Sequence, residues 1–166
     1  MTGRMVRETI PRFGGTAPLE VDRRLRDATY VDASHAEALL LDAQRIDPEC
    51  LPVYFALYKF YFYRSRLADA ERAALRALET AARQGRFPAD WMVLTLNAAD
   101  WSDVRGPAHF YLFSLKALAF IRLRRGRADE AKMLLAKLAE LDPRDTIGGS
   151  AIGALATGSA GVQSRP

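Results

Sequence analysis

Small residues recur along this chain at a fixed spacing. Ala36 and Ala70 are 34 residues apart, and so are Ala43 and Ala77. A recurrence of this length is typical of chains built from stacked repeats, in which each unit is a helix pair that buries its apolar face on its neighbours. The composition favours helix over sheet, because alanine and leucine are abundant while isoleucine and valine are few. The sequence therefore predicts an all-α stack of helix pairs.

Local signals place the predicted helices along the middle of the chain. Residues 34–37 spell S-x-x-E, the pattern of a capping box at a helix start. The helix that follows should end before Pro48, because a proline disfavours helix in the residue before it. Glycine and proline then separate the remaining helices, which are predicted over residues 50–64, 67–83, 107–125 and 128–141.

The stretch YFALYKFYFY, residues 54–63, has seven aromatic residues among its ten. Apolar side chains occupy almost every side of a helix drawn through it, and Lys59 is the one cation inside it. Such a helix must be covered by several neighbours, so it is predicted at the centre of the stack. The apolar run of residues 51–63 is too short to cross a membrane, which takes about 20 residues. We therefore expect no membrane contact.

The residue types at the repeated positions follow a known pattern. Large residues stand in the first helix of the second unit and small ones in the second helix, and the first and third units end in IDP and ELDP. The residues that carry this pattern are Tyr54, Leu57, Tyr61, Ala70, Ala74, Ala77, Leu115, Leu118, Ala119, Gly126 and Ala131. Over about residues 17–143 the chain resembles tetratricopeptide-repeat proteins. The resemblance implies an α-α superhelix of about three helix-turn-helix units.

The repeat pattern also sets the expected domain boundaries. Ala131 follows Ala70 by 61 residues rather than 34, so an insertion at about residues 86–106 separates the second and third units. Residues 17–145 are predicted as the helical domain, and their first helix, residues 17–31, as a degenerate cap. Glycines and a proline predict a flexible tail over residues 1–16, and residues 146–166 are expected to form a short capping helix or a disordered tail.

Residue patterns for catalysis or metal binding are missing from the sequence. His35 and His109 lie at the starts of different predicted helices, without a second ligand at metal-binding spacing. Cys50 is the single cysteine, which fits a reducing, cytoplasmic setting. The net charge is +4, and only +1 of it falls within residues 17–150. We therefore expect a non-catalytic cytoplasmic protein without cofactor or metal.

The family resemblance also implies a binding surface. In tetratricopeptide-repeat proteins the first helices of successive units line a concave face that commonly binds peptides. The matching positions here are Phe55, Lys59, Phe62, Tyr63, Phe113, Lys116, Phe120 and Arg124. An apolar segment with an acidic group would complement this aromatic and basic groove. The prediction is an adaptor that binds a protein or peptide partner.

Two alternatives stay open. The groove could be buried, either by the insertion with Trp91 and Trp101 or by a second copy in a homodimer. The arginines of residues 122–127, RLRRGR, could instead mark a helical-repeat RNA-binding protein. Nucleic acid is the less favoured partner, because cations commonly gather at the last turn of a helix.

A second resemblance lies in two particular stretches of the sequence rather than in the repeat motif. The strings LPVYFALYKFYFY and GPAHFYLFSLKALAFIRLRRGR are similar to small repeat proteins encoded in bacterial nitrogen-fixation gene clusters. This similarity implies a role accessory to nitrogen fixation.

Overall fold

The computed structural model describes residues 7–162, with side chains through Ala156. The described chain is helical apart from one hairpin, which confirms the predicted all-α class. Its helices are α1 (Leu19–Asp27), α2 (Ala33–Ile46), α3 (Leu51–Tyr63), α4 (Leu67–Gly85), α5 (Pro107–Arg124), α6 (Ala128–Leu141) and α7 (Gly149–Val162). The hairpin consists of β1 (Thr9–Arg12) and β2 (Gly15–Pro18), and two short 3-10 helices, η1 (Trp91–Val93) and η2 (Leu96–Ala98), lie between α4 and α5.

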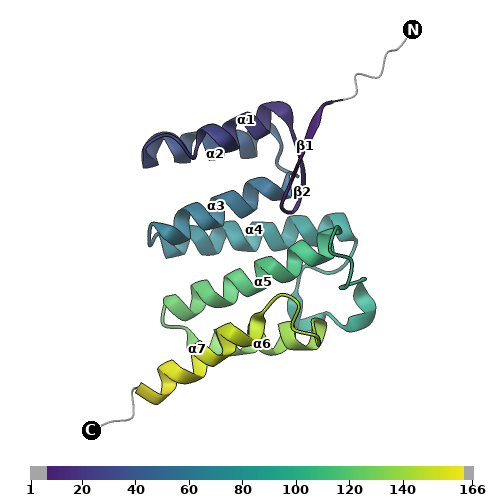
Figure 1. Ribbon diagram of the computed structural model, residues 1–166. Coiled ribbons are helices and arrows are strands. Elements are labelled where there is room, and N and C mark those ends of the chain that lie inside the picture. Colours follow the sequence, from purple (N-terminus) through teal and green to yellow (C-terminus); the bar gives the residue numbers. More distant parts are fainter. Residues whose placement is uncertain (1–6, 163–166) are drawn as a thin grey trace.

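The helices are arranged as consecutive pairs. Figure 1 shows α1–α2, α3–α4 and α5–α6 stacked in chain order, with α7 after the last pair. Ala70, Ala74 and Ala77 are fully buried on α4, which packs closely against both α3 and α5. Small side chains allow this close approach, and large ones such as Tyr54 and Leu57 fill the space beside it. The packing explains the residue types at the repeated positions.

The start of α2 differs from the predicted capping box. The helix begins at Ala33, and its cap is Asp32, whose carboxylate accepts the His35 backbone N–H at 3.0 Å. Bonds from His35 and Ser34 lower the pKa of Asp32 to about 2. The Glu37 side chain is used elsewhere, in an ion pair with Arg66. The cap therefore lies two residues before the serine of the S-x-x-E pattern.

The segment expected to be a flexible tail is partly ordered. Residues 9–18 form an antiparallel hairpin, with Gly14 at φ 95° in its turn. A Cβ at Gly14 would lie 2.8 Å from the Phe110 ring, so the turn sits close against α5. Arg12 holds the hairpin to α1 through a 2.6 Å bond to the buried Asp22. The prediction was wrong for residues 9–16, and residues 1–6 lie outside the described part.

The insertion packs on the outer side of α5. Trp101 is buried against Phe87 and Tyr111, at ring-centre distances of 5.1 and 6.1 Å. The Tyr111 hydroxyl donates to the Ala89 carbonyl at 2.7 Å. On a helix with 3.6 residues per turn, Tyr111 faces away from Phe113 and its neighbours on the predicted groove side. Trp91 lies on the same side as Trp101, with its ring 5.5 Å from the guanidinium of Arg122, so the two tryptophans do not fill the predicted groove.

The C-terminal helix α7 covers the end of the stack, packing on α6 and α5. Ile147 and Ile152 are buried, whereas Leu155 is exposed. The buried Asp142 carboxylate accepts backbone N–H groups from Thr146 and Ile147 and so shapes the turn before α7.

Candidate functional site

The predicted groove between α3 and α5 is largely closed by aromatic packing. Phe13 at the hairpin tip lies between Phe55 and Phe113, with ring centres 4.6 and 4.8 Å away. Farther along the same helices, Phe62 packs against Phe120 at 5.1 Å. All of these phenylalanines of α3 and α5 are partly buried. This part of the predicted groove is therefore filled by the chain itself, and the filling residue comes from the hairpin.

The predicted groove cations have different surroundings. The Lys59 Nζ lies 4.9 Å from the centre of the Phe55 ring, and the Arg124 guanidinium lies 5.4 Å from that of Phe62. Both cations remain exposed to solvent. Tyr63, at the end of α3, is 73% exposed.

Lys116 is occupied by a structural contact. Its Nζ donates to the Ile147 carbonyl at 2.8 Å and so joins α5 to the turn before α7. The residue lies on the predicted side of α5, but its charge is directed to the backbone of the C-terminal turn. Lys116 therefore does not join Lys59 in one open cationic site.

An open pocket lies instead between the first and second helix pairs. Its volume is about 360 Å³, and the hairpin, α1 and α3 contribute to its walls. The apolar lining includes Leu25, Ala28, Pro52, Phe55, Ala56 and Phe60. Three cations also line it, namely Arg12, Lys59 and Arg64. We call this the α1–α3 pocket.

The cations of the α1–α3 pocket are unequally neutralised. Arg12 is paired with the buried Asp22. The Arg64 guanidinium lies 3.7 Å from the centre of the Phe60 ring and donates to the Phe60 carbonyl at 3.1 Å. In the part of the chain that the structure describes, neither Lys59 nor Arg64 has a carboxylate partner. The pocket therefore combines an apolar floor with two unpaired positive charges.

Sequence reasoning found only part of this pocket. Phe55 and Lys59 were predicted as groove residues, whereas Arg12, Phe13 and Arg64 were missed. Arg12 and Phe13 of the hairpin belong to residues 1–16, which were predicted to be a flexible tail because of their glycines. The spacing of Val21 and Leu25 on α1 and of Ala28 directly after it was the available signal, because residues at i, i+4 and i+7 share one helix face.

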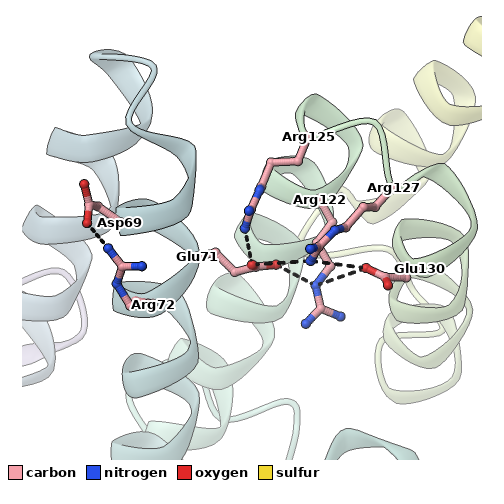
Figure 2. A network of polar contacts seen from close by, with 7 residues as sticks. All are labelled: Asp69, Glu71, Arg72, Arg122, Arg125, Arg127 and Glu130. Atoms are coloured by element: carbon pink, nitrogen blue, oxygen red, sulfur yellow. Dashed lines mark hydrogen bonds and ion pairs between the residues drawn. The ribbon is translucent and has the colours of Figure 1, made fainter.

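The arginine-rich segment RLRRGR is mostly engaged inside the protein. Figure 2 shows the Glu71 carboxylate of α4 among Arg122, Arg125 and Arg127. Arg122 donates to it at 2.8 Å, Arg125 also bonds to it, and Arg127 lies 3.6 Å away. The Glu71 side chain is only 11% exposed. Three of the four arginines that suggested RNA binding therefore tie α5 and the following turn to α4.

The other chemically versatile side chains have local structural roles. His35 contacts Asp32 at 2.7 Å, and His109 packs against Phe113. Cys50 is buried beside the Thr16 carbonyl, and burial raises the pKa of its thiol to about 11. Within the described residues, no group of three or more metal-type ligands comes together. Likewise, no described helix combines the length and apolarity needed to cross a bilayer.

Comparison with known proteins gives one relative. A protein of Azotobacter chroococcum mcd 1, named "Uncharacterized 19.8 kDa protein in nifW 5'region", is 35% identical over 115 residues. The match covers 68% of this chain and 64% of the relative, so the chain spans less than two thirds of that protein's length. No protein-family model matches, and no solved structure matches significantly. The likeness to a protein from a nitrogen-fixation gene region is thus confirmed, while the tetratricopeptide resemblance rests on the residue pattern and the helix pairs.

Proposed function

We propose that this protein is a non-catalytic adaptor that binds a segment of a partner protein on its concave face. The observation that carries the proposal is the α1–α3 pocket, which has an apolar floor beside the unpaired cations Lys59 and Arg64. Apolar pockets with a few polar groups at the edge are the usual anchor sites for side chains of a partner. In this proposal Phe55 and Lys59 contact the partner directly. Phe62, Tyr63, Phe120 and Arg124 extend the surface toward the third helix pair.

The proposed setting is the cytoplasm of a nitrogen-fixing bacterium, with a role accessory to nitrogen fixation. Its support is the relative encoded in the nifW 5' region. The single cysteine is buried as a thiol, which fits a reducing compartment. The partner would then be a protein made under the same growth conditions.

The test is affinity capture from a nitrogen-fixing bacterium grown with and without ammonium. Tagged wild type would be compared with Ala56→Phe, because Ala56 lines the pocket and a phenyl ring there would fill it. Ala68→Phe is the matched control, since Ala68 is exposed on α4 outside the pocket. A protein retained by wild type and Ala68→Phe but lost from Ala56→Phe is the expected result. Equal capture by all three folded proteins would contradict the proposal.

A further inference from the structure

The charge around the α1–α3 pocket is unbalanced. Among the residues that the structure describes, those that line the pocket include three cations and no aspartate or glutamate. Asp22 neutralises Arg12 from outside the pocket, at 2.6 Å. Lys59 and Arg64 instead rest on the phenylalanine rings one helical turn before them, Phe55 and Phe60. A ligand in this pocket therefore meets a net positive field without an internal counter-charge.

The apolar lining of the pocket determines what kind of side chain a ligand must place there. Its volume of about 360 Å³ lies near the lower end of the range for ligand pockets, so it suits one large apolar side chain rather than an extended surface. Phe55 and Ala56 of α3 line it together with Leu25 and Ala28 of the first helix pair. The cations stand beside these walls. A carboxylate must accordingly lie close to the apolar anchor along the ligand chain.

We propose that the α1–α3 pocket binds an acidic protein segment in which one large apolar side chain is flanked by carboxylates. This inference rests on the proposed adaptor role and names the chemistry of the partner. The apolar side chain enters between α1 and α3, and its neighbouring carboxylates pair with Lys59 and Arg64. Desolvation of the anchor supplies most of the affinity, while the two cations select acidic flanks over basic ones.

A nucleic acid is also anionic, but the pocket suits it less well. Single-stranded RNA binds by stacking bases on exposed aromatic faces. Phe60 is only 8% exposed and is covered by Arg64, and Phe55 is covered in part by Lys59 and Phe13. The aliphatic wall formed by Leu25 and Ala28 offers no hydrogen-bonding group to a base. An apolar side chain matches these surroundings better than a base does.

The experiment is a selection from a random peptide library displayed on phage, using full-length wild-type protein as bait and Ala56→Phe for counter-selection. Enriched peptides should place glutamate or aspartate beside leucine, phenylalanine or another large apolar residue. An enriched peptide should then bind Lys59→Glu about tenfold more weakly than wild type. Arg76→Glu is the matched control, because Arg76 is exposed on α4 and outside the pocket, and it should bind normally.

Three results would overturn the inference. They are enrichment without an acidic bias, no pocket-dependent enrichment at all, and equal affinity of wild type and Lys59→Glu. Labelled single-stranded RNA that displaces the peptide and loses affinity in Lys59→Glu would overturn it as well. Capture from cell extract separates the two proposals. A partner lost from Ala56→Phe but kept by Lys59→Glu would leave the adaptor role standing and remove the acidic segment.

Discussion

The Glu71 carboxylate lies between α4 and the end of α5, with Arg122 and Arg125 bonded to its two oxygens. Removing its charge leaves Arg125 without its carboxylate partner and Arg122 with only the more distant Glu130, at 3.9 Å. Glu71→Gln should therefore lower the free energy of unfolding by about 2 kcal/mol, since charged hydrogen bonds in a partly buried site are strong and costly to break. Urea unfolding followed by circular dichroism measures this loss.

Glu130→Gln is the matched control for Glu71→Gln. Glu130 lies in the same network, but it reaches only Arg127 and Arg122, at 3.7 and 3.9 Å, and its side chain is 51% exposed. Water screens such a pair, so the loss should stay below about 0.5 kcal/mol. Similar losses for the two variants would show that burial of Glu71 does not set the strength of the network.

Cys50 gives a prediction about pH. Burial raises the pKa of its thiol from 9.0 to about 11, so the folded protein carries about a hundredfold less thiolate than an unfolded chain below pH 9. Alkylation by iodoacetamide at pH 8 should accordingly be about a hundredfold slower in buffer than in urea, as measured by mass spectrometry. The folded-state pKa of Cys50 lies above the unfolded-state pKa, so the folded protein holds the thiol proton more tightly. The stability that comes from burying the neutral thiol is therefore complete below pH 9 and is lost between pH 9 and 11. Equal alkylation rates would contradict the burial of Cys50.

At the scale of elements, the tip of the hairpin packs on the helices through one aromatic side chain. Phe13 packs between α3 and α5, and it is 39% exposed. Phe13→Ala removes these contacts, at a cost of about 1–2 kcal/mol. Amide hydrogen exchange over residues 9–18 should become about tenfold faster or more. Thr9→Ala, at an exposed position of the same hairpin, should leave exchange unchanged, and equal rates in all three proteins would show that Phe13 is not the anchor.

The bond between Lys116 and the turn before α7 allows a second test of an element. Lys116→Met keeps most of the aliphatic stem but removes the donor to the Ile147 carbonyl. Losing this bond should cost about 1 kcal/mol and speed exchange in residues 147–156 about fivefold. Peptide affinity at the α1–α3 pocket should not change. Lys132→Met, at an exposed position of α6, is the control. A loss of peptide affinity in Lys116→Met would show that Lys116 belongs to the binding surface.

The elements that could be predicted from the sequence are those formed by contacts between residues close together in the chain. The predicted ranges 50–64, 67–83, 107–125 and 128–141 nearly coincide with α3 to α6, because local glycine and proline signals bound these helices. The hairpin depends on Phe13 reaching α3 and α5, a contact between distant residues that no local pattern encodes. The pocket was missed for the same reason, since its walls come from the hairpin and α1 as well as from α3. Glu71 and Arg122 are likewise 51 residues apart, and the insertion between them has a conformation that the sequence did not predict.

The whole molecule is a stack in which each helix pair contacts mainly its neighbours, so its stability should differ between pairs. Among the described residues, the largest fully buried side chains come from α3 to α6 and the insertion, and none comes from α1 or α2. The fully buried side chains of the first pair are smaller, namely Val21, Ala36 and Ala43, and its leucines Leu25 and Leu40 are slightly exposed, at 4% and 3%. Amides of α1 and α2 should therefore exchange through a partial opening whose free energy lies about 1–3 kcal/mol below that of α4 and α5. Native-state hydrogen exchange at increasing urea measures both values.

Ligand binding should act most strongly on this weaker pair, because the α1–α3 pocket joins it to the rest of the stack. A ligand that binds only when the first pair and α3 together enclose the pocket stabilises that arrangement by mass action, by about 2.7 kcal/mol at a hundredfold excess over Kd. A peptide selected on the pocket should therefore slow exchange in α1 and α2 far more than in α5 and α6. Ala56→Phe should abolish this added protection. Protection spread evenly over all helices, or confined to α5 and α6, would place the ligand elsewhere on the stack.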